Sequence, residues 1–403
     1  MLKKFSFFAL AALIFVGCSS ESEDENEVRK FKDSVFAFVN SNPNLIGFGK
    51  IDVKAIMKDG DVEQNSMFQM FASSTYDELK GQLDVTSPIY MAMEVPEDGG
   101  GDPTVYLMAK LKNKKKFEEN WTSMGYIFKK HKGVSYAEDD EQLIALRNDL
   151  LMVVMIPGSY DGKALVSKAF GYVDGKIAPA KLQKKIDAPG DFVMHFDLDR
   201  MKDNDPSMAM IPKGIEADIS LNFENGKMVF EGSSDDSDRL EKQFDIEVLD
   251  NPVIAKKITD AEGNVLMAMQ LSVRSSLTDM MNMNDTMLEE GMSRISEDLA
   301  AIDPTLTMSD MTREDNIVMP ESGKLMGGEA IQIMMDLDAL SSKIPEYGTH
   351  MKELDYASYE MKDGKIRLVI ATHKQNENFL ATVLKAVDTF MMSGGLMQMA
   401  AMN

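Results

Sequence analysis

The sequence predicts an α+β fold with largely antiparallel sheets and flanking helices, built from two or three repeats of a strand–helix–hairpin–helix unit. Short apolar segments are joined by hairpin-type turns such as Asn148-Asp149 and Asn225-Gly226. Other segments, such as 378–392, carry apolar residues at helical spacing. Strands joined by hairpins, with helices between them, are typical of α+β domains and not of a doubly wound parallel sheet.

Composition narrows the classes of function. The 403 residues carry 43 Lys+Arg against 66 Asp+Glu, a formal charge of −23, and 44% are apolar. This apolar content is sufficient for a packed core. The negative charge disfavours nucleic acid and anionic lipid head groups as partners, because like charges repel. The single cysteine excludes an intramolecular disulfide and a cysteine-based zinc site. No nucleophile elbow, phosphate-binding loop or zinc-protease helix is present, so no catalytic residue and no cofactor are assigned.

Residues 1–17 are predicted to be a secretory signal peptide. Lys3 and Lys4 form its positive region, and Phe5–Val16 supplies its apolar region. That region is too short to span a bilayer, which takes roughly 20 residues. We therefore expect the leader to be removed.

The leader ends in Phe15-Val16-Gly17-Cys18, which resembles a bacterial lipobox. The resemblance implies that Cys18 is diacylglyceryl-modified, that the chain is cut before it, and that the new amine is acylated. Phe15 stands where the lipobox pattern usually has an aliphatic residue. Bacteroidota lipoproteins commonly show this variation. Two or more acyl chains give stable anchoring, so we expect a lipid-anchored outer-membrane protein, surface-exposed or periplasm-facing. The alternative is a soluble secreted protein in which Cys18 is incidental.

An acidic tether is predicted over residues 18–40. Five acidic residues lie within the nine positions 19–27, a composition that favours a solvated, disordered segment. The run also resembles the acidic export signal of Bacteroidota surface lipoproteins. The globular part is predicted to form one α+β domain over 41–187 and a second over 188–403.

In the first domain, strands are expected at 88–95 and 104–112, and a hairpin at 143–156 turning at Asn148-Asp149. Asn113 is expected to cap a helix over 114–124.

The second domain contains an internal repeat, predicted at about 190–240 and 329–392. Asp197 and Asp336 each end an apolar strand and stand 139 positions apart, and the turns at Gly226 and Gly364 stand 138 apart. A weaker copy of the same pattern, a predicted strand that ends in an aspartate, occurs at Asp52. Because Asp caps helices well, we expect these three aspartates to cap the helical turns that follow.

A resemblance to a protein family extends over about the first 250 residues. It depends on two further segments, Ser87-Pro88-Ile89-Tyr90 and Leu111–Glu118. Together with the lipobox they are similar to Bacteroidota lipoproteins known only as a domain-of-unknown-function family. The resemblance implies a cell-envelope lipoprotein and supplies no functional residues.

Methionine is the anomaly of composition, with 35 residues against 20 phenylalanines. Thioethers select Cu(I), and the candidate ligands are Met391, Met392, Met397, Met399 and Met402. Alternatively, methionine replaces leucine in the core or forms an adaptable binding surface. The four histidines, His131, His195, His350 and His373, share no metal spacing. The aspartates Asp197, Asp199, Asp203 and Asp205 lack the glycine and glutamate of an EF-hand.

The function predicted from sequence is therefore a non-enzymatic binding or structural module of the cell envelope. Its expected partners are the membrane, through the lipid, and an unidentified protein or glycan. The first alternative is a methionine-based Cu(I) carrier. The second is a surface hydrolase acting on glycans through paired carboxylates.

Overall fold

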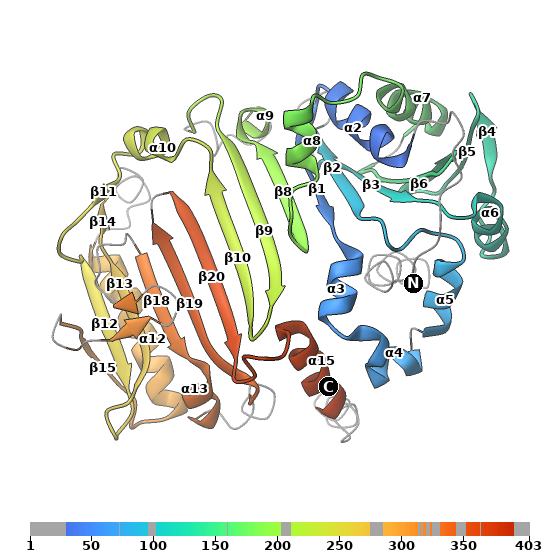
Figure 1. The fold of residues 1–403 in the computed structure, drawn as a ribbon. Coiled ribbons are helices and arrows are strands. Elements are labelled where there is room, and N and C mark those ends of the chain that lie inside the picture. Colours follow the sequence, from blue (N-terminus) through green and yellow to red (C-terminus); the bar gives the residue numbers. More distant parts are fainter. Residues whose placement is uncertain are drawn as a thin grey trace. The chain divides into compact units, whose positions relative to one another are not determined.

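The computed structural model describes residues 30–71, 73–95, 102–158, 160–202, 211–274, 285–312, 315, 317–319, 323–324, 331–343, 352–362 and 364–390. The chain divides into two compact units, unit 1 up to Ser220 and unit 2 from Leu221 onward. Both combine helices with antiparallel strands, which confirms the α+β prediction (Figure 1).

Unit 1 contains one sheet with the strand order β8-β1-β2-β3-β7-β6-β5-β4. Its strands are β1 (Leu45–Ile51), β2 (Ile89–Glu94), β3 (Thr104–Lys110), β4 (Lys129–His131), β5 (Val134–Glu138), β6 (Gln142–Arg147), β7 (Leu150–Met155) and β8 (Phe192–Asp197). Its helices are α2 (Phe31–Ser41), α3 (Val53–Asp59), the 3-10 turn η1 (Val62–Gln64), α4 (Ser66–Phe71), α5 (Ser73–Lys80), α6 (Lys114–Ser123), α7 (Gly162–Val173), α8 (Ala180–Ile186) and α9 (Leu198–Lys202).

Helices cover both faces of the unit 1 sheet. On one face, α2, α7 and α8 pack on buried strand residues that include Tyr90 and Tyr106. On the other, α3, α5 and α6 pack on a second buried cluster that includes the stacked rings of Phe117 and Trp121. Because both faces are buried, β6 and β7 have nearly continuous buried runs instead of alternation.

Unit 2 contains a sheet with the strand order β15-β12-β13-β18-β19-β20-β10-β9. Its strands are β9 (Glu216–Glu224, which crosses the boundary at Ser220), β10 (Lys227–Ser234), β12 (Ile254–Thr259), β13 (Val265–Leu271), β15 (Thr307–Asp310), β18 (Ile331–Asp336), β19 (Leu354–Lys362) and β20 (Lys365–Thr372). The short strands β11 (Glu247–Val248) and β14 (Val273–Arg274) pair with each other, as do β16 (Val318–Met319) and β17 (Gly323–Lys324).

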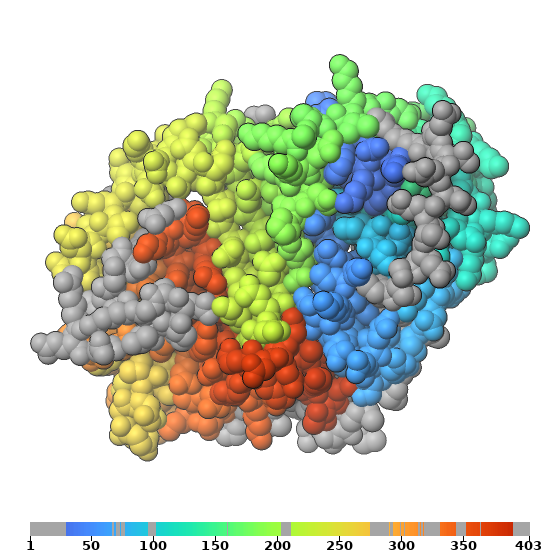
Figure 2. Space-filling model, in the orientation of Figure 1, coloured from blue at the N-terminus to red at the C-terminus, as the bar shows by residue number. Residues whose placement is uncertain are grey.

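The helices of unit 2 are α10 (Ser237–Gln243), α12 (Asp285–Ile302), α13 (Leu337–Lys343) and α15 (Phe379–Phe390). The surface of α15, in red, meets that of the β9–β10 hairpin, in yellow-green, in Figure 2. The Asn378 amide donates to the Phe223 carbonyl at 2.7 Å at this junction. Unit 2 differs from unit 1 in its interior, because its described buried apolar clusters contain only two and three buried residues.

Several local predictions are confirmed. The Asn113 side chain accepts from the Lys116 amide at 3.0 Å and caps α6. Strands β6 and β7 form the expected hairpin, with Asn148 at φ 54° in the turn. The two other hairpin turns place Gly226 at φ 72° and Gly364 at φ 68°, a region that glycine enters without strain.

The boundaries differ from the predicted ones. The predicted tether ran to residue 40, whereas α2 begins at Phe31 and buries seven of its residues. The predicted domain boundary lay at 187, whereas β8 pairs with β1 in the sheet of unit 1, with Phe48 opposite His195. The order strand, short helix, hairpin, helix occurs in β8–α9–β9–β10–α10 and in β18–α13–β19–β20–α15. The element order alone does not establish the repeat, which stays a prediction.

Candidate functional site

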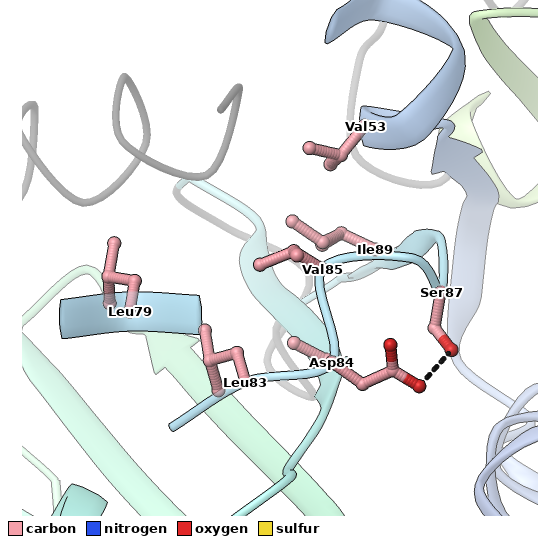
Figure 3. Close-up of a pocket in the computed structure, with 8 residues that line it drawn as sticks. Val53, Leu79, Leu83, Asp84, Val85, Ser87 and Ile89 are labelled. Atoms are coloured by element: carbon pink, nitrogen blue, oxygen red, sulfur yellow. Dashed lines mark hydrogen bonds between the residues drawn. The ribbon is translucent and has the colours of Figure 1, made fainter. Parts of the chain in front are cut away.

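A small apolar pocket lies in unit 1, between α3, α5 and the strands β2 and β3 (Figure 3). Its empty space is about 340 Å³ when the adjoining open solvent is counted, but the part that is enclosed has room for little more than one water molecule. Its lining residues are Val53, Leu79, Leu83, Asp84, Val85, Ser87, Ile89 and Ala109. A pocket of this size and lining suits a small apolar group.

The polar groups of this pocket hydrogen-bond to one another. The Asp84 carboxylate accepts from the Thr86 hydroxyl at 2.7 Å and from the Ser87 hydroxyl at 3.1 Å, and it pairs with Lys110 at 3.1 Å. Burial alone raises the pKa of Asp84, but these hydrogen bonds and the Lys110 charge outweigh burial and lower it. The Asp84 carboxylate is therefore ionised, and its oxygens are already hydrogen-bonded or ion-paired to neighbouring side chains. No histidine lines the pocket, and its one carboxylate is hydrogen-bonded to Thr86 and paired with Lys110.

A more open acidic depression of about 950 Å³ is lined by Glu138, Asp139, Asp140, Gly158, Tyr160, Asp161 and Gly162. Three of its carboxylates have structural partners. Glu138 pairs with Lys129 at 2.5 Å, and Asp161 caps α7 by accepting from the Lys163 amide at 2.9 Å. Asp139 accepts from the Gln142 amide at 3.0 Å. Within the described residues, no group of three or more metal-ligating side chains is arranged to hold an ion.

Asp187 joins α2 to the sheet of unit 1. Its carboxylate accepts from Lys32 at 2.8 Å and from the Tyr90 hydroxyl at 2.9 Å, and the largely buried Lys50 ammonium lies 3.8 Å away. Burial alone raises the pKa of Asp187, but the hydrogen bonds and lysine charges lower it below its usual value. The same carboxylate and the burial of the ring raise the pKa of Tyr90.

Unit 1 is expected to lose stability in acid through Asp187. A depressed carboxyl pKa adds stability above the unfolded pKa of about 3.9, and this contribution is lost as pH falls through the lower folded value. Asp187→Asn is expected to be less stable at neutral pH and to lose less stability on acidification. Urea unfolding followed by the fluorescence of Trp121, the only tryptophan, measures both. Parallel pH curves for the two proteins would contradict the prediction.

His195 on β8 is the most enclosed described histidine. Its Nδ1 contacts the Asp218 carboxylate, and its Nε2 lies 2.5 Å from the Lys185 carbonyl oxygen. Both partners present hydrogen-bond acceptor oxygens to the ring nitrogens. The His195 hydrogen bond lowers the pKa of Asp218. Its ring packs on the Phe48 ring with the two centroids 5.1 Å apart.

The other described histidines have polar neighbours of their own. His131 lies 2.9 Å from the Ser167 hydroxyl, and His373 lies 3.5 Å from Asp338. The structure does not bring these histidines into one site.

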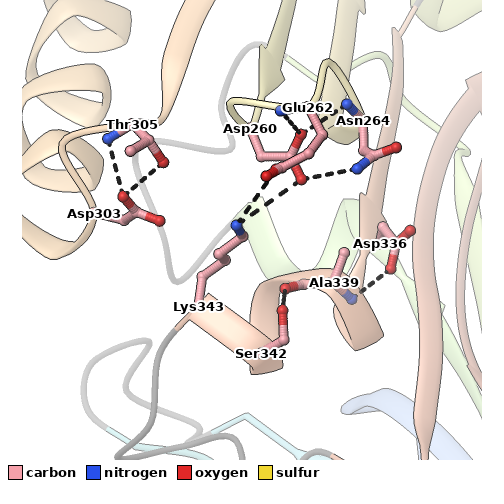
Figure 4. Close-up of polar contacts among 9 residues, drawn as sticks. All are labelled: Asp260, Glu262, Asn264, Asp303, Thr305, Asp336, Ala339, Ser342 and Lys343. Atoms are coloured by element: carbon pink, nitrogen blue, oxygen red, sulfur yellow. Dashed lines mark hydrogen bonds and ion pairs between the residues drawn. The ribbon is translucent and has the colours of Figure 1, made fainter.

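The strand-end aspartates cap helices, as the sequence predicted. Asp52 accepts from the Ala55 amide at 3.0 Å, Asp197 from the Asp199 amide at 3.1 Å, and Asp336 from the Ala339 amide at 2.8 Å. Figure 4 shows the last cap beside Lys343, whose ammonium lies 4.0 Å from both Asp260 and Glu262. Hydrogen bonds from Asn264 lower the pKa of Asp260 and close the β12–β13 turn. These carboxylates hold turns and helix starts.

The described methionines lie mostly in strands. Met108 on β3 and Met152 on β7 are fully buried and directly opposite each other. The predicted copper ligands Met391, Met392, Met397, Met399 and Met402 lie outside the described residues. So do the leader 1–17, Cys18, the acidic run, Asp203, Asp205 and His350. In the described part of the chain, no helix combines the length and apolar character that crossing a membrane takes.

Sequence reasoning missed the apolar pocket. Val53, Leu79, Ile89 and Ala109 come from four separate elements, and only the folded sheet brings them together. No local pattern among residues 53–109 indicates a cavity.

Comparison with known proteins adds a distant structural likeness. No family model matches the chain, and no curated protein matches it. Among solved structures, the chain is similar to TP0453 in its crystal forms IV and III, each with a TM-score of 0.31 and 10% identity. Each match covers 53% of this chain and 87% of that one.

Proposed function

We propose that this chain is a lipid-anchored protein of the bacterial outer membrane that acts as a non-enzymatic binding or structural module. The observation that carries the proposal is the position of Cys18. The only cysteine of the chain stands directly behind a secretory leader, where lipidation requires it. Its partners are the membrane, reached through the lipid, and a protein or glycan of the envelope.

The start of the folded body is consistent with an anchor at Cys18. The Phe31 amide donates to the Asp149 carboxylate at 3.2 Å, so α2 is fixed to unit 1 from its first residue. Phe31 stands 13 positions after Cys18. An extended chain spans at most about 3.6 Å per residue, so Phe31 would stay within about 47 Å of Cys18. The acidic residues between them favour a solvated spacer.

The pocket of unit 1 has room for only a very small apolar group. Its apolar lining has a carboxylate at its edge, and that carboxylate is already occupied by Thr86, Ser87 and Lys110. Such a pocket selects by shape and apolar contact, which suits a module that holds a group without transforming it.

Metabolic labelling with an alkynyl fatty acid tests the anchor. The wild-type protein is expected to be labelled and to sediment with membranes. Cys18→Ala is expected to lose the label entirely, whereas the neighbouring variant Ser19→Ala keeps it. Mass spectrometry of the native protein should place the modification on residue 18. An unlabelled wild type with its leader still attached would end the proposal.

A further inference from the structure

The strand register of unit 2 collects apolar side chains on one face of its sheet. Three rows cross five neighbouring strands, β13, β18, β19, β20 and β10, at directly opposed positions. The first row consists of Met267, Met335, Ala357, Ile370 and Met228. The third row consists of Leu271, Ile331, Met361, Ile366 and Gly232. The second row consists of Met269, Ile333, Tyr359, Leu368 and Phe230. We call these 15 positions the apolar face; apart from the Tyr359 hydroxyl, their side chains carry no oxygen or nitrogen.

The opposite face of this sheet is the more deeply buried one: in its row Ala268, Met334, Ser358, Val369 and Val229, all but Met334 are 0–3% exposed. All positions of the apolar face are half-exposed. On the opposite face, the row that begins with Gln270 and Gln332 continues through Glu360, Arg367 and Glu231. Gln270 and Gln332 are 1% and 0% exposed. The apolar face is therefore the more exposed of the two faces of the sheet.

The apolar face also lies largely outside the described hydrophobic core. In its three rows, Met267 alone joins one of the clusters of buried apolar residues in the described part of unit 2. Helices α13 and α15 lie at the first-row end of these strands and α10 at the other end (Figure 1). Contiguous apolar surface at this exposure is available for contact with an apolar ligand.

A lysine on the neighbouring strand β12 extends the second row. Lys256 on β12 is directly opposite Met269, on the same side of the sheet. The neighbours Ile254 and Ile258 on that side are 6% and 3% exposed, so Lys256 is the single charged position of β12 on this face. Its ammonium pairs at 2.6 Å with Asp310, whose side chain is 81% exposed. An exposed carboxylate holds such a pair weakly, so an anionic head group can replace it.

The dimensions favour a small occupant. Five strands at about 4.8 Å spacing and three rows at about 6.8 Å give a face of about 19 by 14 Å. That area, about 270 Å², is well below the roughly 800 Å² per partner of a stable protein interface. A single acyl chain extends about 15 Å, half of the roughly 30 Å bilayer core. The second row therefore matches one acyl chain.

We propose that the apolar face binds the acyl chain of one long-chain fatty acid, with its carboxylate at Lys256. Five of the 15 positions are methionine, namely Met228, Met267, Met269, Met335 and Met361. Methionine is flexible and adapts to apolar ligands of variable shape. This binding uses the half-exposed methionines of unit 2 and does not depend on the lipid at Cys18.

Titration with cis-parinaric acid, a fluorescent fatty acid, tests the proposal on the chain from Ser19 to Asn403, which keeps every described residue. Leu368→Glu, in the second row between Tyr359 and Phe230, is expected to weaken binding at least about tenfold, because it puts a charge against hydrocarbon. Ile127→Glu is the matched control, since Ile127 is 76% exposed on unit 1 and should leave binding unchanged.

Lys256→Gln tests the head group without disturbing the rows. This variant is expected to bind the fatty acid about tenfold more weakly. That change corresponds to the usual free energy of one hydrogen bond to a charged group. Binding of parinaric acid methyl ester should not change. Circular dichroism of each variant confirms that it folds.

Three results would overturn the proposal. The wild type could fail to bind the probe, or all variants could bind it equally. The wild type could also be a dimer by light scattering that Leu368→Glu converts to a monomer, which would make the face an interface between copies. Because the anchorless chain is used, none of these results bears on the lipidation of Cys18.

Discussion

Phe38→Ala is expected to lower the free energy of unfolding of unit 1 by about 3–5 kcal/mol, the usual range for a buried phenylalanine. The Phe38 side chain is 0% exposed and packs on the rings of Tyr106, at 4.9 Å, and Tyr172, at 5.7 Å. It therefore joins α2 to both β3 and α7. Truncation removes the buried ring and leaves a cavity that three rigid elements cannot close.

Urea unfolding followed by Trp121 fluorescence measures this loss. Trp121 is the only tryptophan and lies in unit 1, so its signal reports that unit alone. Phe38→Leu, which keeps most of the apolar volume, is expected to cost below about 1.5 kcal/mol. A loss below about 1 kcal/mol in Phe38→Ala would mean that α2 belongs to the tether and not to the core.

Glu94→Ala is expected to cost about 3 kcal/mol, the lower limit for breaking a buried ion pair. The Glu94 side chain is 2% exposed. Its carboxylate pairs with Lys168 at 2.7 Å and accepts from the Tyr106 hydroxyl at 2.5 Å and the Asn42 amide at 3.2 Å. Its removal leaves the buried donors without this acceptor. The lower limit applies because Lys168 is 31% exposed and water can reach it.

The matched control is Glu63→Ala, which breaks the exposed pair between Glu63 and Lys80. It is expected to cost about 1 kcal/mol or less. Replacing Lys168 by methionine together with Glu94→Ala should recover part of the loss, because it removes the orphaned charge. Equal losses in Glu94→Ala and Glu63→Ala would show that the network adds no more than a surface pair.

Local features of the fold followed from the sequence because they depend on neighbouring residues. Asn113 caps α6, and Gly226 and Gly364 allow the hairpin turns, through contacts within a few positions. The strand-end aspartates cap for the same reason. The α2 helix was missed because the acidic run before it suggested a continuing tether. The boundary of unit 1 was missed because β8 joins β1 across more than 140 positions, with His195 opposite Phe48.

The candidate binding surfaces were not accessible from the sequence. Alternation within β13 or β20 indicates which residues share a face, since side chains alternate along a strand. It does not indicate which face is covered, nor that Met269 and Ile333 are cross-strand neighbours.

By itself the sequence determined the α+β class, the caps and turns, and the prediction of a leader ending at Cys18. These depend on short-range geometry and on a linear signal. Only the tertiary structure decided that α2 is part of the core, that four elements enclose the pocket of unit 1, and that three apolar rows of unit 2 are half-exposed. Burial is a property of the assembled layers, because a side chain is covered by residues distant in the chain.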